Sequence, residues 1–147
     1  NSVVPAYKFT SSGLVGDDAL DTIFSCEYTK DSDVGTYVIT PTDCTFTSGV
    51  KNNYNIEYVN GTLSIYGSSY NKTSKTVKIY SKYDTDIDCY IVSYAENGTL
   101  DGIKKEHCSL KADKISTIDI SSLKISENDS IKIFLWDNNL TPVEITN

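Results

Sequence analysis

The stretch Asp33-Val34-Gly35-Thr36-Tyr37 decides the fold expected for this chain. It lies between two runs of alternating apolar residues, at 22–28 and 37–40. Two such runs, joined by a short segment rich in Asp, Ser and Gly, predict a hairpin or a corner of a β-sandwich. The alternative is an ordinary hairpin with an exposed Tyr37.

Three residues are expected to build the corner. Gly35 can take a positive φ without steric cost, and Asp33 can cap the turn with its carboxylate. The Tyr37 hydroxyl would hydrogen-bond to upstream backbone, as a Tyr does at the corner of immunoglobulin-like sandwiches. The corner therefore predicts scaffold and no chemistry, and we expect it to belong to the first module alone.

Composition predicts an all-β chain. The 147 residues can form one domain or two small ones. Tyr occurs 11 times and Met is absent, and Tyr, Thr, Val and Ile all suit half-buried strands. We find no convincing run of apolar residues at helical spacing. The expected architecture is two small immunoglobulin- or fibronectin-like β-sandwiches in tandem.

The net charge of −7 argues against negatively charged binding partners for this chain. A surface of this sign repels phosphate backbones and anionic lipid heads, so we expect no nucleic acid and no direct membrane contact. No apolar run has the length that a transmembrane helix needs. Residue 1 is Asn and no signal peptide is recognisable, so we expect a piece of a longer secreted chain.

Four cysteines fall as one pair in each part of the chain: Cys26 with Cys44, and Cys89 with Cys108. No pair has the Cys-x-x-Cys spacing and the chain holds one His, so a zinc site is not expected. An even count in small secreted β-modules favours disulfides, here 26–44 and 89–108. Four buried free thiols are the alternative.

Blocks of the first part resemble the MBG domain, a small bacterial immunoglobulin-like module of surface and secreted proteins. In the order of that family they are Pro-Ala-Tyr at 5–7, Gly-Leu-Val-Gly-Asp at 13–17, Ser-Asp-Val-Gly-Thr-Tyr-Val-Ile-Thr-Pro at 32–41, Asn-Tyr-Asn-Ile at 53–56 and Tyr-Val-Asn-Gly-Thr-Leu-Ser-Ile at 58–65. The resemblance covers residues 1–66. It implies a spacer, stalk or adhesin module and carries over no catalytic residue.

Within that module the alternation predicts an edge strand at 3–10, limited by Pro5, and a strand closed by Pro41. Asn60-Gly61 is the preferred dipeptide of a type I′ turn, so residues 54–58 and 63–65 are expected to form a tight hairpin.

Residues 67–75 are small and polar apart from Tyr70, which fits an exposed linker. Residues 76–147 then predict a second sandwich of about five strands, whose most apolar run, at 131–137, is expected in the centre of a sheet. This part loosely resembles β-modules at the ends of clostridial multidomain surface proteins and glycan-degrading enzymes, which implies structure without a defined activity.

Two groups of residues are candidate binding sites. Alternating carboxylates at Asp84, Asp86 and Asp88 could offer oxygens to calcium, although a solvated acidic loop is the favoured alternative. Aromatic rings could stack on sugars, with core packing as the alternative; the candidates are Tyr66, Tyr70, Tyr80, Tyr83 and Trp136.

No catalytic site is expected, and no cofactor. His107 and Cys108 are neighbours on a predicted strand, so their side chains should point to opposite faces and cannot readily form a dyad. The chain also lacks a phosphate-binding loop, a nucleophile elbow and a metalloprotease motif.

The sequence therefore predicts a non-catalytic pair of modules from a larger bacterial surface or secreted protein, acting as a spacer, stalk or adhesive segment outside the cell. The alternative is a carbohydrate-binding appendage of a secreted glycan-degrading enzyme, which a row of coplanar exposed aromatic rings would favour. Expected partners are neighbouring domains of the same parent chain and a host or cell-wall glycan or protein.

Overall fold

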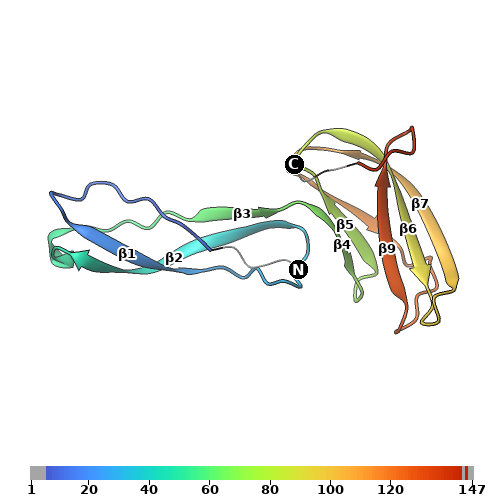
Figure 1. Cartoon of the computed structure of the whole chain (residues 1–147), viewed down its shortest axis with the longest axis horizontal. Coiled ribbons are helices and arrows are strands. Elements are labelled where there is room, and N and C mark those ends of the chain that lie inside the picture. Colours follow the sequence, from blue (N-terminus) through green and yellow to red (C-terminus); the bar gives the residue numbers. More distant parts are fainter. Residues whose placement is uncertain (1–5, 144, 146–147) are drawn as a thin grey trace. The chain divides into compact units, whose positions relative to one another are not determined.

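The computed structural model describes residues 6–143 and 145, and these residues fold as β-structure. The strands are β1 (Ala19–Ser25), β2 (Gly35–Ser48), β3 (Gly61–Ile65), β4 (Gly67–Asn71), β5 (Thr76–Tyr80), β6 (Thr85–Tyr94), β7 (Leu100–Leu110), β8 (Ile115–Asp119) and β9 (Ser130–Trp136). They form three small antiparallel sheets (Figure 1). The described part of the chain has no α-helix, only the 3-10 turn η1 (Lys51–Asn53). The all-β prediction is confirmed, whereas immunoglobulin-like topology stays a prediction.

The chain divides into two compact units, and the division does not fall at one point. The first unit runs to Ser32 and resumes over Thr36–Ser64, whereas the second takes Asp33–Gly35 together with the chain from Ile65 onward. The expectation that the corner belongs to the first module alone is therefore wrong.

The first unit contains one sheet of order β1-β2-β3. β1 and β2 pair antiparallel, as the alternating runs predicted, but β2 continues to Ser48 and does not end at Pro41. Ile23 and Phe24 face Asp43 and Pro41, so the register shifts by one residue at Thr42. Such a bulge tolerates proline because the ladder is interrupted there.

Two further strand predictions in this unit are wrong. Residues 54–60 form no strand, and Gly61 opens β3 with a φ outside the positive range that a type I′ turn needs. The chain instead reverses its direction just after β2, at Gly49, whose φ is +90°. Of the edge strand expected at 3–10, residues 6–10 form none and residues 3–5 lie outside the described residues.

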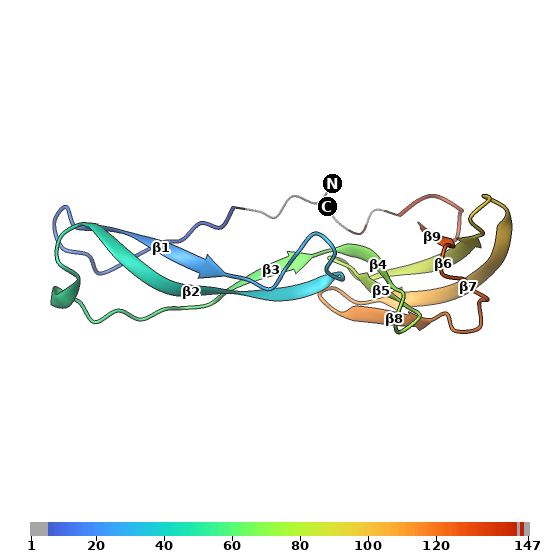
Figure 2. The ribbon, with the colours of Figure 1, turned by 90° about the horizontal axis from the view of Figure 1, so that it is seen from below.

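The second unit has two sheets, of order β4-β5-β8 and β7-β6-β9 (Figures 1 and 2). Each sheet turns one face toward a shared hydrophobic core, because alternate residues of a strand point to opposite sides. The buried core residues are Val77, Ile79, Ile87, Cys89, Ile91, Leu110, Ile118, Ile120 and Ile145. The strongly alternating runs of the sequence thus correspond to β5, β6, β7 and β8.

Two predictions that rested on composition are wrong in this unit. Residues 67–71, assigned to an exposed linker, form strand β4, which pairs with β5 from Gly67↔Tyr80 to Asn71↔Thr76. The side chains of this strand are small and polar, so its composition resembles that of a linker. Its backbone is nevertheless paired with β5, and Tyr70 packs against the core. The apolar run at 131–137 forms β9 at the end of its sheet, and β6 is the central strand.

The three corner residues have separate roles. Asp33 accepts hydrogen bonds from Lys78 Nζ at 2.7 Å and Ser69 Oγ at 3.1 Å, and the Lys78 ammonium lowers the pKa of the Asp33 carboxyl. Gly35 has φ +142°, as predicted. Tyr37 packs edge-to-face on Tyr28, with ring centroids 5.2 Å apart; a corner bond from its hydroxyl stays a prediction.

Gly35 gives a direct test of these contacts. A side chain there would adopt an unfavourable φ, and its Cβ would lie 3.2 Å from Ile115 Cδ1. We expect Gly35→Val to lower the free energy of unfolding of the second unit by about 2 kcal/mol, the usual cost of a strained backbone residue. Calorimetry measures the shift. Gly61→Ala is the control, because Gly61 lacks a positive φ and its Cβ would make an ordinary 3.6 Å contact. An unchanged second transition in Gly35→Val would contradict the prediction.

Candidate functional site

The cysteines form no disulfide in the structure, and all four are free thiols. Cys44 faces Thr22 in the β1–β2 ladder, whereas Cys26 follows Ser25, which faces Thr40. Four residues of strand separate the two thiols, about 13 Å, whereas a disulfide joins Cα atoms that lie within about 7 Å. The 26–44 pairing therefore fails for a geometric reason.

In the second unit, Cys89 and Cys108 lie diagonally across β6 and β7, because Cys89 faces Glu106 and Cys108 faces Ile87. Diagonal positions are about 7–8 Å apart, at the limit of disulfide reach. Burial raises the pKa of Cys89 to about 12, and burial also raises the pKa of Cys108. Both thiols stay protonated at neutral pH and act as core side chains.

The three aspartates proposed for calcium do not converge. Asp84 accepts hydrogen bonds from the Ala112 N–H and from Lys111 Nζ, and Asp88 binds side chains on β7. Within the described residues, no group of three His, Cys, Asp or Glu side chains is arranged to hold a metal ion.

The five candidate sugar-stacking rings do not share one surface. Tyr80 is buried, and Tyr66 stacks on it with centroids 4.8 Å apart and planes 7° apart. Tyr70 packs against the core, whereas Tyr83 is exposed. Only Trp136 lies among other accessible aromatic rings, on the outer side of the β7-β6-β9 sheet.

Strand register builds that outer side from three rows, each crossing β7, β6 and β9 in turn. We call these nine residues the aromatic face: His107, Asp88 and Trp136; Lys105, Tyr90 and Phe134; Ile103, Val92 and Lys132. Residues between them in sequence, such as Cys89 and Ile91, point into the core instead.

Charged groups at one end of the aromatic face bind one another. Asp88 is 9% exposed, and its carboxylate lies 2.7 Å from Lys105 Nζ and 3.1 Å from His107 Nδ1. The Lys105 ammonium, followed by the His107 ring, lowers the pKa of Asp88. His107 and Cys108 lie on opposite faces of β7, so they form no dyad, as the sequence predicted.

Aromatic rings on this face are inclined to one another. Tyr90 and Trp136 have centroids 5.4 Å apart with planes at 51°, and Phe134 and Trp136 are 6.2 Å apart at 63°. Lys105 Nζ lies 5.4 Å from the centroid of Tyr90, a cation–π contact that occupies one side of that ring. The rings accessible to a ligand are Phe134 and Trp136.

The sequence indicated Trp136 and Asp88 but missed Tyr90, Phe134 and Lys105. Their clustering depends on which residues face one another across three strands. The turn at 95–99 sets the β6–β7 register, with Gly98 at φ +81°. Alternation from Asp88 to Tyr94 was the one signal that these residues share a face.

The first unit contains a cavity of about 480 Å³. It lies between sheet residues such as Phe24 and Phe46 and the two irregular segments 8–14 and 54–61. Tyr28 and Cys44 are the buried hydrophobic side chains among this unit's described residues. The first unit therefore buries few apolar side chains and has an open pocket beside its sheet.

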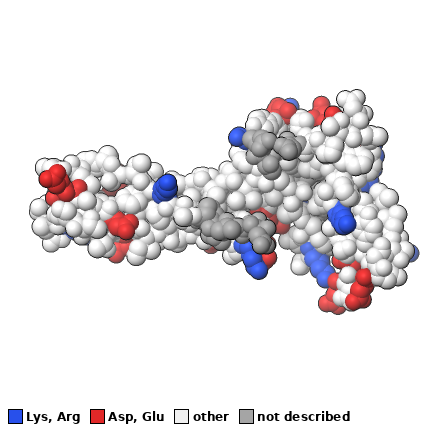
Figure 3. All heavy atoms as spheres, viewed as in Figure 1, with Lys and Arg blue, Asp and Glu red and all other residues white. Residues whose placement is uncertain are grey.

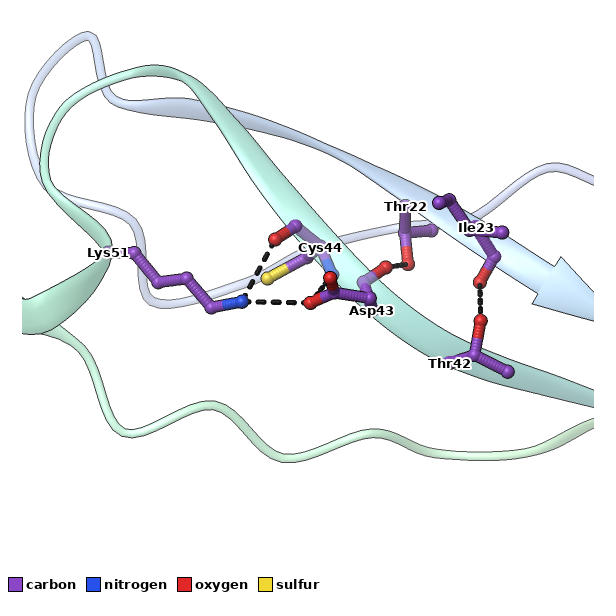
Figure 4. A network of polar contacts seen from close by, with 6 residues as sticks. All are labelled: Thr22, Ile23, Thr42, Asp43, Cys44 and Lys51. Carbon is purple, nitrogen blue, oxygen red and sulfur yellow. Dashed lines mark hydrogen bonds and ion pairs between the residues drawn. The ribbon is translucent and has the colours of Figure 1, made fainter.

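A network of polar side chains covers β2 beside this cavity (Figure 4). The Cys44 N–H donates to Asp43 Oδ1 at 2.8 Å, and Lys51 Nζ donates to the Cys44 carbonyl at 3.0 Å. Lys51 also pairs with Asp43 at 2.9 Å and lowers the pKa of that carboxyl. Both main-chain groups of Cys44 thus have side-chain partners.

Comparison with known proteins identifies the first part of the chain only. Residues 2–64 match the family described as MBG domain (YGX type), a non-catalytic module typical of segments of bacterial surface proteins. No curated protein and no solved structure matches the chain. Among the described residues, no helix is long and apolar enough to cross a membrane.

Lys51 should protect the strand that it covers. We expect Lys51→Ala to leave the Cys44 carbonyl open to pairing with another chain and to increase self-association, with little loss of thermal stability. Size-exclusion chromatography over a range of concentrations measures the effect. Lys30→Ala, at an exposed lysine in the same unit, is the control. Equal elution of the two variants would contradict the protective role.

Acid should weaken the second unit partly through Asp88. Its pKa is depressed in the folded state, so its contribution is complete above the unfolded value of about 3.9 and is lost as pH falls through the lower folded value. We expect Asp88→Asn to be less stable than wild type at pH 7 and to lose less on acidification. Circular dichroism during acid titration measures this, with the exposed Asp86→Asn as control. Parallel titration curves for wild type and Asp88→Asn would refute it.

Proposed function

We propose that the chain is a non-catalytic spacer segment of a bacterial surface protein, which holds neighbouring domains of its parent away from the cell. The MBG match over residues 2–64 is the observation that supports this most. The second unit adds a rigid body, because two sheets close on a core of fully buried aliphatic side chains such as Ile79, Ile87 and Ile91.

Edge protection also supports a role at a crowded surface. Neighbouring copies of a displayed protein expose their strand edges to one another, and exposed edges invite pairing between chains. In the first unit Lys51 and Asp43 cover the main chain of Cys44. In the second, residues after β9 return beside it, with the Val143 N–H donating to the Leu135 carbonyl at 2.9 Å.

Replacement within the parent protein tests the spacer role. We expect an unrelated folded β-module pair of similar length to restore display of the neighbouring domains when it replaces residues 1–147. A Gly/Ser linker of equal residue number should restore less, because flexible chains are short on average for their length. Antibody binding to the adjacent domain on whole cells measures display. Full restoration by the linker, or none by the folded pair, would overturn the spacer role.

A further inference from the structure

The aromatic face carries more exposed apolar surface than a structural sheet requires. Ile103 is 56% exposed and Phe134 is 37% exposed, whereas the residues of β6 that face the core, such as Ile87 and Ile91, are fully buried. Both lie on one side of one sheet, in neighbouring rows. Contiguous apolar surface with a polar rim is characteristic of binding sites.

We propose that the aromatic face binds a neutral glycan. A sugar ring has an apolar side of C–H groups, which carry slight positive charge, and a rim of hydroxyl groups. Phe134 and Trp136 offer the negative faces of their rings to such C–H groups. At the other end of the Trp136 row, the exposed His107 ring can bond the hydroxyls, and Asp88 between them holds that ring in place.

The polar groups are held ready for this contact. Asp88 is fixed by Lys105 and by His107 Nδ1, which leaves Nε2 as the ring nitrogen that can meet a ligand. Lys105 is held in turn over the Tyr90 ring. Groups that are ordered before the ligand arrives lose little freedom on binding.

Size favours a sugar over a protein partner. Three strands about 4.8 Å apart, and rows two residues or about 6.8 Å apart, give a patch of roughly 10 by 14 Å. Stable protein interfaces bury about 800 Å² on each partner, several times this area. A short stretch of oligosaccharide fits the patch.

Charge on the aromatic face is small. Asp88 offsets Lys105, which leaves the single positive charge of Lys132, whose Nζ lies 5.2 Å from the centroid of the Tyr94 ring. The whole chain carries −7 and repels acidic polysaccharides. On the side of the molecule seen in Figure 3, acidic groups are scattered and lysines do not gather into a broad basic patch.

Ring geometry further selects the kind of glycan. Flat polysaccharide surfaces are matched by rings lying in one plane, whereas the planes of Phe134 and Trp136 differ by 63°. Inclined rings follow a chain that twists from one sugar to the next. The ligand is therefore a single soluble chain and not a crystalline surface.

Titration of the full chain with neutral hexaoses tests the proposal. Cellohexaose, xylohexaose and mannohexaose are added to millimolar concentration while amide shifts are followed by NMR. We expect at least one to shift the amides of β6, β7 and β9. Phe134→Ala should weaken its binding about tenfold, the loss expected for one stacking ring. Phe134 is the exposed member of the pair, so this variant should keep the fold; Trp136→Ala is the second variant, checked by circular dichroism.

Tyr83→Ala is the matched control, because Tyr83 is an exposed aromatic residue outside the aromatic face. It should bind as wild type does. The proposal is overturned if no hexaose shifts these amides, if Phe134→Ala and a folded Trp136→Ala both bind like wild type, or if only acidic polygalacturonate binds. The spacer role is judged by display in the parent protein, so either idea can fail without the other.

Discussion

The pairing of β6 with two neighbours is the constraint on which the second unit depends. β6 joins β7 on one side and β9 on the other, and every side chain along it is thereby assigned to one of two faces. Ile87, Cys89 and Ile91 fall on the inner face and are fully buried. A one-residue slip would exchange the faces and turn Asp88 and Tyr90 toward the hydrophobic core, which would place an ionised carboxylate among aliphatic side chains.

The two units differ in how they are stabilised. The second closes two sheets over one core of aliphatic side chains, which is the usual source of stability in a small β-domain. The first has one sheet, a cavity of about 480 Å³ and few buried side chains. Its local stability should be the lower of the two, since it buries fewer apolar side chains.

Sequence patterns predicted the positions of strands better than the pairing and register between them. Alternation located β5 to β8 because period two is a local property. The rule that proline ends a strand failed at Pro41, and the rule that Asn-Gly makes a tight turn failed at Gly61. In both places the pairing with another strand decided the outcome, through a bulge beside Pro41 and through the strand β3 at Gly61. Among the candidate site residues, Trp136 was found by type alone. Tyr90 and Phe134 could not be found, since they meet only once the register Tyr90↔Phe134 exists.

Membership of Asp33–Gly35 in the second unit has a consequence for where such a chain can be divided. A gene break between residues 64 and 65 would separate Lys78 from the carboxylate at 2.7 Å and Ser69 Oγ from the Val34 N–H at 3.2 Å. The fragment from residue 65 onward would then carry Lys78 and Ser69 without the partners that residues 33 and 34 supply. A cut at residue 64 is therefore not a clean domain boundary, and the second unit is complete only when it is produced together with residues 33–35.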